Sequence, residues 1–317
     1  MRKLSFGLFI PLSGECSIPS FIKKISCKAE SLGYSNLWVE DHYRLPWTDR
    51  TLDAWIALGY IASNTSQIRI GTCVTPIPFR YPPFLAKEAA TVDVLSSGRL
   101  EFSAGLGWVE KEFKSFGIPW ERFRIRGRKM VEGLKLIVEA WLGEELTFRG
   151  EYYQVDSLRL EPKPIQKPYP PIWLGGSSHL ILNTAITYGD GWIPWQPTLS
   201  FLGKAIKYLS KVRNGRELPK LKFGVVGHSI IAESFERAVE LIPPERAEDA
   251  LKGRSGSSDA QKRSPWIIGS PREIMELMEK YLKLGVNHVA LSFAPRTPRH
   301  ILSMAEMFAE EIISAFT

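Results

Sequence analysis

The chain has 317 residues, of which 44% are hydrophobic and 24% are charged, a balance typical of a folded globular protein. The net charge of +7 favours an anionic ligand, but the basic cluster at residues 122–129 belongs to no nucleic-acid-binding motif, so a solvated helix face is preferred. The three cysteines form no CxxC pair, which argues against disulfides and zinc and indicates a reducing, cytoplasmic compartment. No apolar run is long enough to span a membrane, so neither a membrane nor a nucleic-acid partner is expected.

Short apolar segments typical of strands alternate with longer segments that have helical apolar spacing. The expected strands are residues 3–10, 35–40, 67–75, 99–107, 171–176, 189–195, 221–231 and 287–293. The first helix is expected to end near Gly33, and the later ones at residues 52–64, 83–96, 129–141, 177–188, 199–212 and 271–284, with one more at the end. A hairpin at residues 146–155, turning at Arg149-Gly150, interrupts the alternation.

This alternation predicts a parallel sheet, because each pair of parallel strands needs a crossover connection. Eight strand–helix units in a chain of this length predict a single domain, residues 1–317, with the (β/α)8 TIM-barrel fold; a doubly wound open sheet is the alternative. Residues 243–265 are rich in Gly, Ser and charge, and predict a flexible insertion after the seventh strand, near the barrel mouth. That insertion could be a lid.

The second predicted strand ends in the sequence Glu40-Asp41-His42. Catalytic groups of such barrels lie at the C-terminal ends of the strands. Histidine titrates near neutral pH, and a neighbouring carboxylate can orient it. We therefore expect His42 to transfer a proton, with Asp41 orienting its ring, and prefer this to a histidine that only caps a loop. The other histidines are interpreted as structural: His179, His228, His288 and His300.

Glu110 follows the turn after the fourth strand. It is either an acid with a pKa raised by burial or a first-turn glutamate favoured by the helix dipole, and the sequence does not favour one over the other. Glu112 is the less favoured neighbour. The turn lacks the third glycine of a dinucleotide fingerprint, so Gly107 is expected instead to let the backbone approach a flat ligand.

The segment Ile172–Ser178 predicts an anion-binding turn. A strand ends in Gly175 and Gly176, and Ser177 and Ser178 open a helix whose free N–H groups and dipole favour a phosphate. The alternative is a glycine turn with a serine cap. The chain contains no HExxH, Walker A or GxSxG pattern, so zinc proteases, P-loop NTPases and α/β-hydrolases are not favoured.

Taken together, the segments LWVEDHY (37–43), GTCVTPIPFRYPP (71–83), GRLEFSAGLGWVEKEF (98–113) and PIWLGGSS (171–178) resemble the bacterial-luciferase-like oxidoreductases. This is a family of flavin- and deazaflavin-dependent barrels, and the resemblance covers nearly the full length. The combination of EDH with GTCVTPIPFRY is most similar to the coenzyme F420-dependent branch.

The resemblance implies a role for each matching residue. Cys73 and Val74 would be joined by a cis peptide bond behind the deazaflavin. Asp41 and His42 would face the reacting carbon, and Glu110 would be the active-site acid. Gly175, Gly176 and Ser177 would hold the cofactor phosphate. The full set of residues expected to bind the cofactor is Asp41, Cys73, Val74, Thr75, Gly107, Gly175, Gly176 and Ser177.

The sequence thus predicts an F420-dependent oxidoreductase that moves hydride between the deazaflavin and a small organic substrate, either an alcohol or carbonyl compound or a pterin one-carbon carrier. One alternative is an FMN-dependent monooxygenase that uses reduced flavin and O2 and receives that flavin from a partner reductase. Another is a flavin-binding barrel without turnover. The family implies a homodimer.

Overall fold

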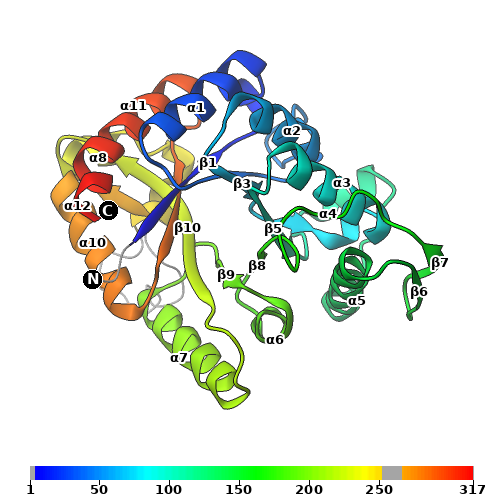
Figure 1. Cartoon of the computed structure of the whole chain (residues 1–317). Coiled ribbons are helices and arrows are strands. Elements are labelled where there is room, and N and C mark those ends of the chain that lie inside the picture. Colours follow the sequence, from blue (N-terminus) through cyan, green and yellow to red (C-terminus); the bar gives the residue numbers. More distant parts are fainter. Residues whose placement is uncertain (1–3, 252–265, 317) are drawn as a thin grey trace.

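The computed structural model describes residues 4–251 and 266–316, and eight parallel strands in it form a closed barrel (Figure 1). Around the barrel each of these strands pairs with its neighbour, and the last strand, β12, pairs with the first, β1, to close the ring. The predicted TIM-barrel fold is confirmed. The barrel strands are β1 (Ser5–Ile10), β2 (Asn36–Val39), β3 (Arg69–Thr72), β5 (Leu100–Gly105), β8 (Ile172–Leu174), β9 (Gly191–Trp192), β10 (Lys222–Ile231) and β12 (His288–Phe293).

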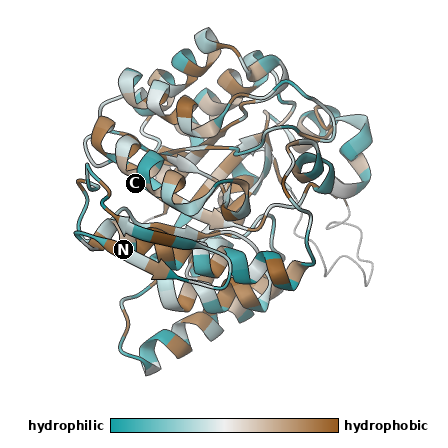
Figure 2. Ribbon diagram, turned by 90° about the vertical axis from the view of Figure 1, so that its right-hand side faces the viewer, coloured by the Kyte–Doolittle hydropathy of each residue, from teal (hydrophilic) through white to brown (hydrophobic). Residues whose placement is uncertain are grey.

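Helices surround the barrel and turn their apolar faces toward the strands (Figure 2). In helix α10 (Pro271–Leu284), Ile274, Met278 and Tyr281 are buried at helical spacing, and Gly285 ends the helix with φ 98°. Within the described residues, no helix is long and apolar enough to cross a membrane. The other long helices are α1 (Pro19–Ser31), α2 (Ala54–Asn64), α3 (Pro82–Leu95), α5 (Phe123–Leu142), α6 (His179–Tyr188), α7 (Leu199–Gly215) and α11 (Pro298–Phe308).

The segment between β10 and β12 contains more than one crossover helix. After β10 come helix α8 (Phe235–Glu240), a 3-10 turn (Pro244–Arg246) and the short helix α9 (Ala247–Leu251). Strand β11 (Ile267–Gly269) then pairs with the C-terminal end of β10. Most of the predicted insertion at 243–265 lies outside the described residues, so its flexibility and its role as a lid stay predictions.

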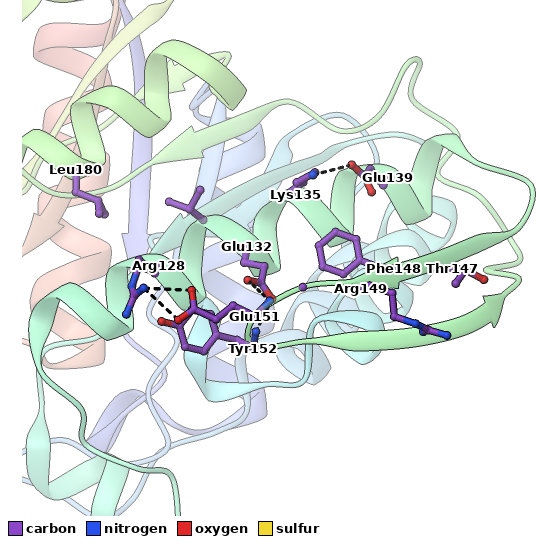
Figure 3. A pocket seen from close by; sticks show the side chains of 12 residues that line it. Arg128, Glu132, Lys135, Glu139, Thr147, Phe148, Arg149, Glu151, Tyr152 and Leu180 are labelled. Atoms are coloured by element: carbon purple, nitrogen blue, oxygen red, sulfur yellow. Dashed lines mark hydrogen bonds and ion pairs between the residues drawn. The ribbon is translucent and has the colours of Figure 1, made fainter.

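A two-stranded hairpin projects from the barrel beyond α5 (Figure 1). Its strands are β6 (Leu146–Arg149) and β7 (Gln154–Leu158), so the turn is longer and lies later than predicted. The cause is Glu132 of α5, whose carboxylate accepts hydrogen bonds of 2.8–3.0 Å from three successive backbone N–H groups of this turn (Figure 3). A tight turn at Arg149-Gly150 could not present all three groups.

The interior of the barrel forms its own apolar cluster. Phe9, Trp38, Trp173, Ile193 and Val226 fill the space inside the strands, and Cys73 and Val74 pack against them. Small barrels of eight strands are filled by such layers, so the cluster closes the barrel from below. It leaves an apolar floor under the C-terminal ends of the strands.

Candidate functional site

A cavity of about 660 Å³ lies at the C-terminal ends of the barrel strands, where the fold places active sites. Every barrel strand contributes to it through its C-terminal end or the loop that follows. Of the residues predicted from the sequence, those that line the cavity are His42, Cys73, Val74, Gly107, Gly175, Gly176 and Ser177. Asp41, Thr75 and Glu110 lie outside the lining.

His42 is held by a buried carboxylate, and that carboxylate belongs to Glu112. The Nδ1 atom of His42 lies 2.9 Å from Oε2 of Glu112, whose side chain is completely buried. The other carboxylate oxygen accepts from the backbone N–H groups of Tyr43 and Arg44, at 2.5 and 3.2 Å. Because Glu112 is a hydrogen-bond acceptor, it fixes the proton on Nδ1 and leaves Nε2 as the nitrogen for exchange with a ligand.

Of the two interpretations of Glu110, the structure shows the first-turn glutamate and not the active-site acid that the family resemblance implies. It is the first residue of helix α4 (Glu110–Ser115), its side chain is exposed, and it forms an ion pair of 2.6 Å with Lys114 one turn later. The helix turns Glu112 and Phe113 inward together, so Glu112, the less favoured candidate, is the glutamate that reaches His42.

Asp41 also differs from its predicted role, because its partners are Arg80 and Thr75 rather than His42. Arg80 binds both carboxylate oxygens of Asp41, at 2.8 and 3.0 Å, and Thr75 donates to one of them at 2.8 Å. Burial alone would lower the pKa of Arg80, but the charges of Asp41, Tyr43 and Asp53 raise it above its usual value. Asp41 and Thr75 therefore lie behind the cavity lining and stabilise the loops that form it.

The predicted cis peptide bond between Cys73 and Val74 is present. Val74 packs against the backbones of Gly105 and Gly175, where an added Cβ would lie only 2.4 Å from a Val74 methyl group. Because these two glycines have no side chain, Val74 can pack closely against them in the cavity floor. Burial raises the pKa of the Cys73 thiol to about 12, so this cysteine is not a thiolate nucleophile at neutral pH.

The glycine–serine turn after β8 has the shape of an anion cradle. Gly176 has φ +124°, a conformation that favours glycine, and Ser178 caps helix α6 by accepting from the Ile181 N–H at 3.3 Å. Gly175, Gly176 and Ser177 line the cavity at the positive end of this ten-residue helix. The turn can therefore bind a phosphate through backbone N–H groups.

The wall formed by β10, β12 and their loops was not predicted as part of the site. His228, interpreted above as structural, lines the cavity together with Arg246 and Arg296. Burial lowers the pKa of His228 to about 3, with contributions from both arginines, so the ring is neutral at physiological pH. The sequence offers little signal for this wall, because its residues lie far apart along the chain and share no motif.

Comparison with known proteins identifies the family. The model of the luciferase-like monooxygenases matches residues 17–288 of the chain. The chain belongs to this family. The resemblance found in the sequence is therefore confirmed over most of the described structure.

Several relatives extend along nearly the whole luciferase-like chain. An F420-dependent glucose-6-phosphate dehydrogenase of Amycolatopsis mediterranei is 25% identical over 329 residues, covering 93% of this chain and 94% of its own. An FMNH2-dependent dimethylsulfone monooxygenase of Pseudomonas putida is 24% identical and covers 80% of this chain and 75% of its own. The crystal structure of a monooxygenase from Streptomyces bottropensis superposes with a TM-score of 0.83 at 20% identity, covering 99% of this chain and 100% of that one. The prediction of an oxidoreductase is confirmed at the level of the enzyme class.

Proposed function

We propose that this luciferase-like protein is an F420-dependent oxidoreductase that transfers hydride between the deazaflavin and a small organic substrate, an alcohol or carbonyl compound or a pterin one-carbon carrier. The observation that carries the proposal is the His42–Glu112 pair, which holds an oriented imidazole at the edge of a cavity with an apolar floor. Relatives named as F420-dependent dehydrogenases match the chain over nearly its full length. These relatives are the basis for choosing F420 as the cofactor.

The cavity suits a flat ring that carries a phosphate. Val74, Ile193 and Val226 give it an apolar floor on which such a ring can stack. The turn at Gly176 and Ser177 lies at a helix N-terminus and can take the phosphate. His228 has a buried Nδ1 without a hydrogen-bond partner among the described residues, so a polar group of the ligand can satisfy it.

The chain's own residues manage the proton that accompanies hydride transfer. A deazaflavin held over Val74 and by the turn at Gly176 and Ser177 would supply the hydride exchange with the substrate carbon. Nε2 of His42 takes the hydroxyl proton as an alcohol becomes a carbonyl compound, and returns it in the reverse reaction. Glu112 keeps the ring in the required tautomer and orientation, while Trp47 and Trp108 at the rim limit the access of water.

Parallel fluorescence titrations with F420 and FMN test the cofactor. We expect tight binding of F420 and weak binding of FMN. His42→Ala should keep F420 binding and abolish turnover of any substrate found, because general acid–base catalysis typically contributes about 100-fold to 10,000-fold in rate. Turnover at the wild-type rate in this variant would remove His42 from the mechanism.

The second candidate is an FMN-dependent monooxygenase, supported by the dimethylsulfone monooxygenase relative that uses FMNH2. In that case a separate reductase would supply the reduced flavin. Consumption of oxygen with free reduced FMN would favour this candidate over the first. A barrel that binds flavin without turnover is the third, and it would bind cofactor tightly while His42→Ala changed no assayed reaction.

We also propose a homodimer, as the family implies. Large apolar side chains on adjacent helices are exposed, with Ile56 of α2 at 78% and Phe84 of α3 at 69%. Such side chains on neighbouring helices are suited to an interface between copies. The particle mass in solution, measured by light scattering, tests this proposal.

A further inference from the structure

Two arginines lie on the side of the cavity formed by β10 and β12. Arg296 follows β12, and Arg246 ends the 3-10 turn after α8. The guanidinium group of Arg246 lies 5.5 Å from the ring centre of Trp47, and that of Arg296 lies 5.7 Å from the ring centre of Phe9. Aromatic neighbours leave the hydrogen-bond donors of both groups available in the plane of the guanidinium.

Glu40 fixes the direction of Arg296. Nη1 of Arg296 donates to Oε2 of Glu40 at 2.9 Å, and the Glu40 side chain is only 5% exposed. The other oxygen of Glu40 accepts from the Leu12 N–H at 3.0 Å and the Ser13 hydroxyl at 2.5 Å. One oxygen of Glu40 thus accepts from one of the five N–H donors of Arg296. This bond orients the guanidinium group and leaves other donors available for a ligand.

The charges on this wall do not cancel. Among the described residues that line the cavity, the ionic side chains are Glu40, Arg246 and Arg296, and His228 between them is neutral. One carboxylate therefore faces two guanidinium groups. A partly buried cation without a full counter-charge is stabilised by an anionic ligand, and arginine pairs well with carboxylate and phosphate oxygens.

The wall is separate from the glycine–serine turn. The turn follows β8, whereas Arg296 follows β12, and strands β9 and β10 lie between them around the barrel. A phosphate held by the turn does not neutralise the wall on the other side. The cavity therefore offers two distinct places for an anion.

We propose that Arg296 and Arg246 bind an oxyanion, a carboxylate or phosphate group, on the small organic substrate of this cavity. The proposal rests on the proposed function in that it assigns the substrate to the same cavity. His228 contributes through its Nδ1, which has no hydrogen-bond partner among the described residues and can bond to a polar group of the same ligand. The substrate is then an organic acid or a phosphate monoester, and its neutral counterpart is disfavoured.

Calorimetric titration of inorganic phosphate, and separately of acetate, into the cofactor-free and the F420-loaded protein tests this inference. We expect saturable binding of at least one anion. Arg246→Gln and Arg296→Gln should each weaken it by about tenfold or more, since each removes a charge-assisted hydrogen bond. Arg272→Gln is the matched control, because Arg272 is 86% exposed on helix α10 and pairs with Glu276. Tighter binding of phosphate than of acetate would indicate a phosphate monoester, and the reverse an organic acid.

The outcomes separate this inference from the proposed function. No anion binding by the wild type, or binding that is unchanged in both arginine variants, overturns the inference and leaves the F420 titration unaffected. Arginine-dependent binding by a protein that does not bind F420 supports the inference and overturns the cofactor assignment. If Arg296→Gln does not fold, Arg246→Gln decides alone, because it alters only the short 3-10 turn outside the barrel.

Discussion

At the scale of single residues, two glutamates of the short helix α4 have different positions, and only one of them contacts the site. Val109 and Phe113 are both buried, one helical turn apart, and Glu112 shares their inward face. Glu110 lies on the outer face, where it pairs with Lys114. The sequence contained this signal, because Glu110 and Lys114 have the spacing of a surface ion pair.

Glu112→Gln should change the state of the His42 ring. The carboxylate accepts from three donors, whereas an amide has one oxygen and would place N–H groups against N–H groups. We expect nitrogen-15 NMR of the wild type to show His42 protonated on Nδ1, and Glu112→Gln to shift the population toward the other tautomer.

Glu110→Gln is the control for this experiment, because it removes the same charge two residues away on the exposed side of the helix. Its His42 spectrum should match that of the wild type. Equal spectra for both variants and the wild type would show that Glu112 does not set the tautomer. A change in Glu110→Gln alone would restore the prediction made from the sequence.

At the scale of elements, the order and type of most helices and strands could be predicted, because apolar periodicity is a local property of the chain. Helix α10, for example, has the predicted bounds Pro271–Leu284. The ion pairs that join one loop to another could not be predicted from this periodicity. Arg80 joins Asp41 after β2 to Asp53 at the start of α2, partners that precede it by 39 and 27 residues. No spacing rule connects residues so far apart.

Arg80→Met should strongly destabilise the protein, because it leaves Asp41 buried without a cation. Removing one partner of a buried ion pair costs about 3–5 kcal/mol. Asp41 is only 1% exposed, and Arg80 is 7% exposed. Urea denaturation at neutral pH measures the change in the free energy of unfolding.

The comparison for this prediction is Arg44→Met, which breaks an ion pair with Asp49, a residue that is 79% exposed. Exposed pairs contribute about 0–1 kcal/mol, so this variant should be close to the wild type. If both variants lost the same stability, the Arg80 cluster would have no special role in joining the two loops.

At the scale of the whole molecule, two neutral histidines belong to the barrel: His288 is buried inside it, and His228 is half-buried and lines the cavity. His288 lies among Trp38 and Trp173, accepting from Trp38 Nε1 at 2.9 Å, with its Nδ1 2.9 Å from the Ser5 hydroxyl. Burial lowers its pKa to about 3, and Lys222 adds to the shift. The barrel was predictable from the strand pattern, but this pairing was not, because it joins the first, second and last strands.

The stability of the protein should fall as the pH falls below about 6.5, the pKa to which an unfolded histidine returns. Between about pH 6.5 and pH 3 the unfolded chain binds protons that the folded chain excludes from His288 and His228, so acid favours unfolding. Each histidine contributes a slope of up to about 1.4 kcal/mol per pH unit in this window. Urea denaturation between pH 6 and pH 5 measures the slope while most carboxylates stay ionised.

His288→Gln isolates one of the two contributions. Its side-chain oxygen can still accept from Trp38, but the group no longer titrates. A loss of stability that is equal at every pH does not affect the result, because the slope and not the absolute value is decisive. We expect the slope to be smaller than that of the wild type by about 1 kcal/mol per pH unit.

His300→Gln is the control for this prediction and should keep the full slope. It removes a histidine near the start of α11 whose Nδ1 lies 2.8 Å from the Thr297 hydroxyl. Identical slopes in all three proteins would mean that His288 accepts a proton in the folded barrel.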